Sequence, residues 1–273
     1  MVVWLLAPLR DLRRHLVSLR RFWGSSLASQ LEYQFNAFIE LLAMVGNLAG
    51  SLLVLWLFDR QGVPLGGWSW AGALVVLGAY TVLTGFTSCL LQPNLSRIVT
   101  HVQEGTLDFV LLKPIDSQFW LSLRTVSAAG VPEMVLGVVL MVGAALQERG
   151  SLNPAAVLLM AAMLMAAALT LYALWFVLAT TSIWFVKTWN ATEVLRAVLT
   201  AGRYPVAAFP PALRTLFTLV LPVAFLTTVP AEALLERATA PWIGGSVAVA
   251  CGALAISRAF WQLALRFYTS ASS

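Results

Sequence analysis

The sequence predicts an all-α, polytopic membrane protein with six transmembrane helices. Apolar residues make up 60% of the chain and charged residues only 11%, whereas soluble domains carry about 25% charged residues. The mean hydropathy is +0.83. The apolar residues also gather in long runs, and about 20 mostly apolar residues suffice for a helix to cross the hydrocarbon core of a bilayer. Together these observations exclude an ordinary soluble domain.

Six apolar runs are the candidate transmembrane helices. The fourth exceeds the length of one perpendicular crossing, so we expect it to tilt or to continue past the interface near Trp184. The fifth is short and contains Pro222, which predicts a kinked or broken helix. The predicted spans are Phe35–Phe58, Trp70–Leu91, Thr125–Leu146, Pro154–Val186, Ala212–Val229 and Trp242–Phe267.

The residues before the first span predict an amphipathic helix at the membrane interface. Apolar residues recur there at steps of three and four, and arginines occupy the other faces. Such a helix lies in the headgroup plane, with its basic side toward anionic lipid. It is either a simple membrane anchor or a gating element. We therefore divide the chain into an interfacial segment at residues 1–30 and a six-helix membrane domain at residues 31–273. The apolar stripe is Leu9, Leu12, Leu16, Leu19, Trp23 and Leu27.

The basic residues predict the orientation of the spans. Six crossings place both termini on one side, and 14 of the 17 lysines and arginines fall on that side. Because basic residues concentrate in cytoplasmic loops, we expect both termini to be cytoplasmic. The net charge of +5 is then a topological signal, and we expect no nucleic-acid partner. The terminal side includes Arg196, Arg203 and Arg214, whereas Arg60, Arg149 and Arg237 fall opposite.

Two carboxylates fall inside predicted spans, Glu40 in the first and Glu133 in the third. A charge at the bilayer centre is unfavourable by about 2.5–3.5 kcal/mol, so such residues usually face protein or water. Glu133 follows Pro132, where a freed backbone carbonyl predicts a kink. Both carboxylates are candidates for a substrate path or a proton-linked site. A structural hydrogen bond to a neighbouring helix is the alternative.

Motifs for catalysis or metal binding are not found in the sequence. It has no P-loop, no HExxH, no G-x-S-x-G and no CxxC pair. Cys89 and Cys251 lie within apolar runs, and His15 and His101 are far apart. We therefore expect no catalytic site, metal or cofactor in this chain. The energy for driven transport would come from an ion gradient or from a separate subunit.

A charged, proline-containing segment at residues 101–120 interrupts the apolar chain. Pro93 and Gly105 predict the boundaries of a short helix near Ser96–Glu104. Ile98, Val99 and Val102 form its apolar side. A second helical turn is expected after it, ending at Pro114.

The run from Leu107 to Leu112 within this segment is too short to cross a bilayer and too apolar for a free loop. It is expected to dock on a soluble partner or on the protein's own membrane rim. The flanking Glu104, Asp108 and Lys113 would supply orientation and specificity.

Three stretches resemble the type-2 ATP-binding-cassette (ABC) exporter permeases, and in particular the six-span bacterial group. They are "LEYQFNAFIE" before the first span, "EGTLDFVLLKPID" after the second and "FPPALRTLFTLVLPVAFLTTVPAEALL" around the fifth. The resemblance implies a cytoplasmic coupling segment at about residues 93–120. Within it, Ser96–Ile115 would be the coupling helix, seated in a cleft of a separate ATPase subunit.

The resemblance also implies partners and a further element. A second permease subunit, identical or paralogous, would complete the path, and ATP and Mg would bind to the partner ATPase. An outer helical hairpin would fall at Pro230–Pro241. The residues expected to bind the ATPase are Glu104, Gly105, Leu107, Asp108, Leu111, Leu112, Lys113 and Pro114.

These expectations lead to three hypotheses. The first is the permease subunit of an exporter in the bacterial inner membrane, which moves an amphipathic or hydrophobic substrate. The second is a stand-alone secondary carrier or channel that uses Glu133 or Glu40, although no internal inverted repeat is obvious. The third is a membrane enzyme acting on a lipid or quinone. It would need paired histidines or acids near an interface, which the sequence does not supply.

Overall fold

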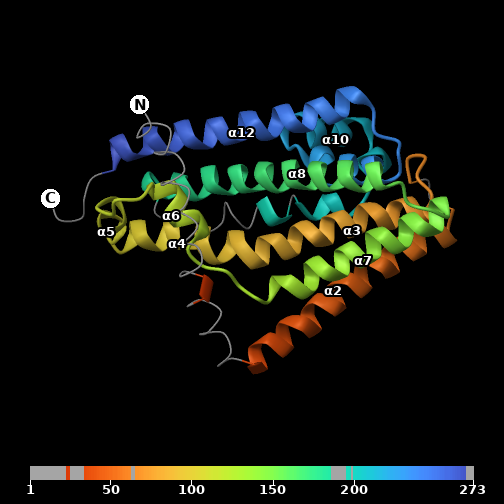
Figure 1. Cartoon of the computed structure of the whole chain (residues 1–273), viewed down its shortest axis with the longest axis horizontal. Helices are drawn as coiled ribbons and strands as arrows, with labels where there is room; N and C mark the ends of the chain where they lie inside the picture. Colours follow the sequence, from red (N-terminus) through yellow and green to blue (C-terminus); the bar gives the residue numbers. More distant parts are fainter. Residues whose placement is uncertain (1–22, 25–33, 63–64, 186–194, 198, 269–273) are drawn as a thin grey trace, which may run out of the picture.

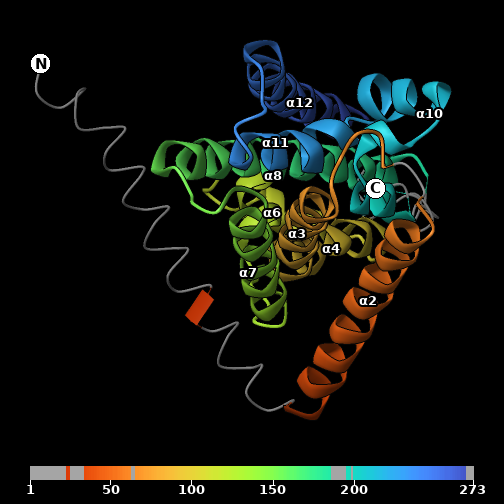
Figure 2. The same ribbon diagram turned by 90° about the vertical axis from the view of Figure 1, so that its right-hand side faces the viewer.

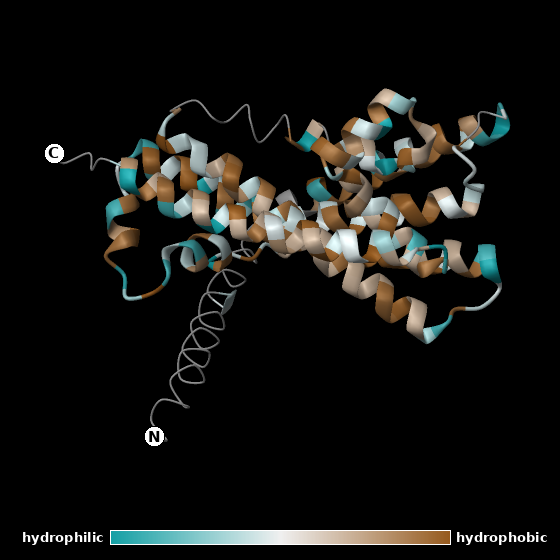
Figure 3. Cartoon of the chain, turned by 90° about the horizontal axis from the view of Figure 1, so that it is seen from above, coloured by the Kyte–Doolittle hydropathy of each residue, from teal (hydrophilic) through white to brown (hydrophobic). Residues whose placement is uncertain are grey.

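The computed structural model describes residues 23–24, 34–62, 65–185, 195–197 and 199–268. Over these residues the protein is all-helical, with 82% helix and no strand. The helices lie lengthwise in an elongated bundle, with more hydrophilic segments at its two ends (Figure 1, Figure 3). The predicted all-α, multi-pass fold class is thereby confirmed. Of the predicted N-terminal helix, all but Trp23 and Gly24 lies outside the described residues.

Five helices in the described chain are long and apolar enough to cross a membrane. They correspond to the predicted first, second, third, fourth and sixth spans. The hydroxyl of Ser69 and the side-chain oxygen of Asn153 cap two of them by accepting backbone N–H groups, and Gly150 at φ 75° ends a third. The helices are α2 (Gln34–Arg60), α3 (Trp70–Phe86), α7 (Gly130–Arg149), α8 (Pro154–Thr180) and α12 (Ala240–Phe267), and α3 is the first part of a longer span.

The second span continues directly into the segment predicted as a separate short helix. A π-helical turn, η1 (Thr87–Leu91), links α3 to α4 (Gln92–Gln103), and the three form one helix of 34 residues. The prediction that Pro93 breaks the chain is wrong. Pro93 has no N–H for the carbonyl of Cys89, but the wider π turn accommodates the ring and the backbone N–H of Ser127 donates to that carbonyl at 2.8 Å.

The third span begins at Gly130 and not at Thr125, because the preceding loop is tied to α4. The Asn94 side chain accepts the backbone N–H of Thr125 at 2.8 Å and donates to the carbonyl of Thr125 at 2.6 Å. Pro132 then lies in the first turn of α7, where a missing N–H leaves no helical bond unmade. The helix runs through Pro132 without a break, so the predicted kink there is wrong.

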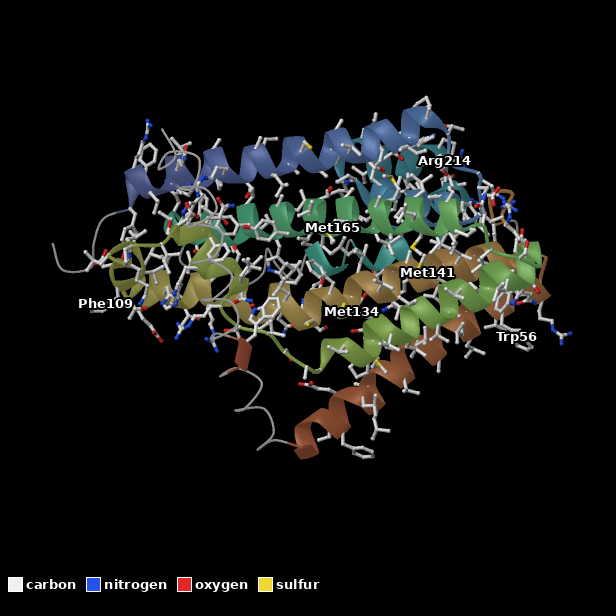
Figure 4. The ribbon with its side chains drawn as sticks, in the orientation of Figure 1. Trp56, Phe109, Met134, Met141, Met165 and Arg214 are labelled. Carbon is white, nitrogen blue, oxygen red and sulfur yellow. The ribbon has the colours of Figure 1, made fainter. Side chains whose placement is uncertain are left out.

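α3 and α7 approach each other closely through glycines. Gly78 and Gly85 on α3 face Gly137 and Gly130 on α7. A Cβ at any of the four would lie within 2.8 Å of backbone atoms of the opposite helix. Small residues allow such close approach in membrane helices. The side chains of Met134 and Met141 cover the glycines of α3 (Figure 4).

The fifth predicted span, residues 212–229, is a bent pair of helical segments. The first arm is α10 (Pro211–Thr215) with the π turn η5 (Leu216–Val220). The second is the π turn η6 (Ala224–Thr228) with α11 (Val229–Leu234). The arms meet at 78°, which confirms the break predicted at Pro222.

Both ends of this bent pair lie at the same end of the bundle. Arg214 donates to the carbonyl of Ala207, whose backbone abuts Gly66 in the loop between α2 and α3. After α11, the carbonyl of Leu235 accepts a hydrogen bond from Arg149 at the end of α7. The pair is therefore a hairpin that enters and leaves from one end. The hairpin expected at Pro230–Pro241 is not found there: those residues form most of α11, a loop and the start of α12, and the bent pair occupies residues 211–234 instead.

The connection before the hairpin runs lengthwise inside the bundle. Leu195 is buried with Leu95 and Ile98 at the α4 end, and Ala207 reaches the α2–α3 loop at the other. This segment carries the 3-10 turns η3 (Thr200–Arg203) and η4 (Val206–Ala208) between α3 and α8 (Figure 1). The sequence placed Arg203 and Arg214 on the terminal side. The structure instead places Arg203 inside the bundle and Arg214 at the opposite end.

Candidate functional site

The end of α4 is closed by a tight turn at Gly105, which has φ 66°. The backbone N–H of Thr106 donates to the carbonyl of His101 at 2.9 Å, and that of Gly105 to the carbonyl of Val102 at 3.3 Å. These are the two bonds of a Schellman motif, in which a glycine adopts the left-handed conformation. The helix end predicted at Gly105 is confirmed. On α4, Ile98 and Val99 are buried, as predicted for its apolar side.

The short helix α5 (Leu107–Leu111) follows this turn at once. Leu107 and Val110 are buried against the neighbouring helices. Phe109 is 69% exposed and Leu112 is 81% exposed, and Phe109 lies at the α5 end of the molecule (Figure 4). The run predicted to dock as a whole is therefore divided. One side holds α5 to the protein, and the other side leaves Phe109 and Leu112, with Leu111 beside them, open.

The charged residues around α5 differ in their surroundings. Glu104 caps the end of α4 and is exposed. Asp108 lies beside the hydroxyl of Tyr268, just after α12. Lys113 lies over the ring of Trp120 at 5.3 Å, and Pro114 follows it on the surface. Lys113 is thus directed toward the protein's own surface, whereas Glu104 is open to solvent.

The next helix, α6 (Ser117–Leu123), begins at Asp116 and is tied to α12 by an ion pair. The Asp116 carboxylate accepts the backbone N–H of Phe119 at 2.9 Å and pairs with Arg258 of α12 at 2.6 Å. Partial burial works to raise the pKa of Asp116. The hydrogen bonds from Arg258 and Phe119 outweigh that effect and hold the pKa below its usual value.

A buried polar network extends this connection. Gln118 donates to Ser257 of α12 at 2.9 Å and to the hydroxyl of Tyr172 of α8 at 3.2 Å. The indole N–H of Trp261 donates to Ser117 at 3.0 Å. The sequence analysis did not identify this network. Its only sequence signals were a polar pair at Ser257–Arg258 inside an apolar span and the helix start at Asp116.

The two carboxylates predicted for a substrate path line one groove of about 450 Å³. Glu40 lies on the exposed side of α2, and Glu133 lies in the first turn of α7 and is hydrogen-bonded to Ser88. The structure thus brings together two acids that are far apart in sequence. The groove is lined by residues of α2 on one side and of α3, α4 and α7 on the other, and Figure 2 shows α2 standing away from the other helices. The groove adjoins a second cavity of about 220 Å³ between α3 and α8.

The opposite end of the bundle is closed by ion pairs. Arg237 contacts Glu148 at 2.7 Å, and Arg149 contacts Glu236 at 3.1 Å. Ser69, at the start of α3, donates to Glu148 at 2.7 Å. These bonds join the end of α7 to the end of the hairpin and to the α2–α3 loop. They hold that end together, whereas the other end presents exposed apolar side chains on α5.

Comparison with known proteins identifies one family. Residues 45–272 match the family model described as "ABC-2 family transporter protein". The match extends from within α2 through α12 and includes α5, α6 and the hairpin. A search of curated proteins found no match.

Proposed function

The chain belongs to the ABC-2 family of transporter proteins, and from that premise we propose that it is the permease subunit of an exporter. Proteins of this family are membrane transporter components, generally without a catalytic site of their own, that normally work with an ATPase subunit. ATP and Mg bind to that separate ATPase. The permease moves an amphipathic or hydrophobic substrate across the bacterial inner membrane.

The exposed side of α5 carries the proposal, because it has the features of a docking surface. Phe109 and Leu112 are large, exposed apolar side chains within and directly after α5, which lies at one end of the bundle (Figure 1). They are held in place by the Schellman turn at Gly105 and by the buried Leu107 and Val110. Rigid, exposed apolar side chains within a polar rim are typical of protein–protein interfaces. We assign residues 96–115 as the coupling segment, with Glu104 on its rim.

The network around α6 gives a route from this surface to the membrane helices. Displacement of α5 and α6 by the ATPase pulls on α12 through Asp116 and Arg258, and on α8 through Gln118 and Tyr172. ATP binding on the partner then biases two arrangements of the permease by favouring one position of the coupling segment.

The orientation follows from the same assignment. The coupling end and both termini are cytoplasmic, and the basic residues remain concentrated there with Arg203 and Arg214 removed from the count. The indole N–H of Trp23 donates to the carbonyl of Leu123 at the end of α6, so Trp23 itself lies beside the proposed coupling segment. A second permease subunit, identical or paralogous, covers the exposed apolar face of α2 and completes the path.

The test replaces Phe109 and Leu112 by Asp. The double variant should fold, since both side chains are exposed, yet lose co-purification with the ATPase subunit and ATP-dependent efflux. The matched control, Phe109→Leu with Leu112→Met, keeps apolar side chains at the same positions and should retain both activities. If the Asp variant binds the ATPase and transports as the wild type does, α5 is not the coupling surface.

The secondary carrier remains the second candidate, because Glu40 and Glu133 line the same groove. It predicts transport by the isolated chain in proteoliposomes, driven by a proton gradient without ATP and abolished by Glu133→Gln. Such transport would contradict the exporter proposal. Transport that needs both the ATPase and ATP would contradict the carrier.

A further inference from the structure

The cavity of about 220 Å³ lies inside the bundle, between α3, α8 and the lengthwise connection after Leu195. It shares lining residues with the groove that contains Glu40 and Glu133. Residues of α2, α3 and α7 line that groove, so the cavity adjoins a hollow between α2 and the helices that α2 stands away from (Figure 2). The two share four lining residues, namely Asn47, Thr84, Ser88 and Gln92.

Two arginines line the cavity, each with its guanidinium over an aromatic ring of a different helix. The guanidinium carbon of Arg196 lies 5.3 Å from the ring centre of Trp175 on α8. That of Arg203 lies 5.2 Å from the ring centre of Tyr80 on α3. A guanidinium over the face of an aromatic ring is attracted by the negative face of that ring. These two contacts position two positive groups on the walls of one cavity.

Arg203 has hydrogen-bonding capacity that the described residues leave unused. One terminal nitrogen donates to Oδ1 of Asn47 at 2.8 Å, but its buried Nε has no acceptor within the described chain. Arg203 takes part in none of the ion pairs among the described residues. The carboxylate of Glu133, which acts on it electrostatically from the adjoining groove, is hydrogen-bonded to Ser88. An unpaired buried N–H is unfavourable, and a bound anion would accept a hydrogen bond from this Nε while pairing with the guanidinium charge.

The remaining walls define the rest of the ligand. Leu83, Leu171 and Leu226 line the cavity beside the arginines. The adjoining groove is bordered by α2, a helix whose apolar residues are mostly exposed. Polar residues line much of that groove, and Ala43, Met44 and Pro93 give it an apolar side along which an apolar chain can extend toward the bilayer. A ligand with an anionic end and an apolar body matches this arrangement.

We propose that the cavity binds the anionic headgroup of an amphiphile, held by Arg203 and Arg196. The inference rests on the proposed function, because it names the substrate class of that exporter. The shared chemistry is one compact anionic centre, such as a phosphate monoester, sulfate or carboxylate, bound by charge-assisted hydrogen bonds from guanidinium groups. Glu40 and Glu133 in the groove disfavour a headgroup whose negative charge extends beyond the two arginines.

Dodecyl phosphate titrated onto the full chain in dodecyl maltoside tests the proposal, with the thermal unfolding midpoint as the readout. It should raise the midpoint of the wild type. Arg203→Gln and Arg196→Gln should each weaken its apparent affinity about ten- to hundredfold, the loss expected for a charge-assisted hydrogen bond. The control Arg266→Gln removes an exposed positive charge from α12, outside the cavity, and should bind as the wild type does.

Two further arms keep the result decisive. Arg203→Lys retains the positive charge but lacks the planar guanidinium, so it should weaken binding less than Arg203→Gln does. It also provides a second measurement at this position if Arg203→Gln folds poorly. Inorganic phosphate should bind far more weakly than dodecyl phosphate. Unchanged affinity in both Gln variants would overturn the assignment of the arginines. If inorganic phosphate bound as tightly as dodecyl phosphate, the proposal that the ligand is an amphiphile would be overturned.

This experiment is independent of the ATPase. The Phe109→Asp, Leu112→Asp variant should bind dodecyl phosphate as the wild type does, because its substitutions lie on α5. Normal ATP-dependent transport combined with failed anion binding would overturn only the present inference. Normal anion binding with no dependence of transport on an ATPase would overturn the proposed function and leave the anion site standing.

Discussion

The helices α7 and α2 both flank α3, but they meet it in opposite ways. α7 packs against α3 through glycines that a single Cβ would force apart. α2 carries Gly46 and Gly50, each with nothing within 4 Å of a Cβ position, and it stands away from the bundle (Figure 2). Both helices are apolar enough to span a membrane. Glycine content therefore does not decide packing; the position of the glycines opposite one another does.

The difference indicates separate roles for the two helices. α3 and α7 pack closely together, and the loop before α7 is tied to α4 through the bonds between Asn94 and Thr125. α2 borders the groove that leads to the arginine-lined cavity. Its exposed apolar face remains free to contact lipid or a second subunit.

The largest expected effect is the replacement of Gly137 by Leu. The side chain would enter the backbone of α3 near Val82, and overpacking of this kind destabilises by about 3 kcal/mol or more when the backbone cannot yield. The control is Gly46→Leu on α2, which should change the unfolding midpoint little. Thermal unfolding in detergent measures both. A Gly137→Leu protein as stable as the control would mean that α3 and α7 are not fixed together.

A smaller effect is expected for Asn94→Ala. Asn94 is buried, and its removal leaves the N–H and carbonyl of Thr125 without their partner. The expected loss is about 2–3 kcal/mol in the free energy of unfolding. Asn47→Ala on α2 removes a single, exposed hydrogen bond from Arg203 and should lose at most about 1 kcal/mol. Equal losses would remove the contrast between the two regions.

The smallest effect on the isolated chain is expected for Leu42→Ala. Leu42 is exposed on α2, so the substitution should change the stability of the monomer by less than about 0.5 kcal/mol. If a second permease subunit covers this face, the same substitution should weaken association, which the mass of the complex in detergent reports. A large loss of stability without loss of association would show that α2 packs within its own chain.

Much of the fold could be predicted because the bilayer restricts the chain to long apolar helices. Apolar runs alone located five spans. The predicted fifth span at residues 212–229 is instead part of a hairpin. Composition could not distinguish the two, because a hairpin that enters and leaves from one end needs the same apolar residues as a crossing helix. Pro93 misled the prediction because its consequence depended on the backbone N–H of Ser127, 34 positions further along the chain.

The candidate site was predictable to the extent that it is local. Gly105 was predicted as a helix end because its conformation depends on neighbouring residues alone. The division of the apolar run into buried and exposed sides depended on how α5 packs against α4 and α6. The bond between Asp116 and Arg258 joins residues 142 positions apart, and no local pattern indicates it. The same holds for the meeting of Glu40 and Glu133 in one groove.

Site-specific photo-crosslinking can detect the proposed contact between α5 and a separate ATPase subunit. A benzophenone amino acid is placed at Phe109 or Leu112, and as a control at Leu158, which is exposed on α8. The permease is co-expressed with its ATPase subunit and illuminated in membranes. We expect a covalent adduct with the ATPase from positions 109 and 112 and none from position 158. An assembled, transporting complex that gives no adduct at 109 or 112 would contradict the proposed contact.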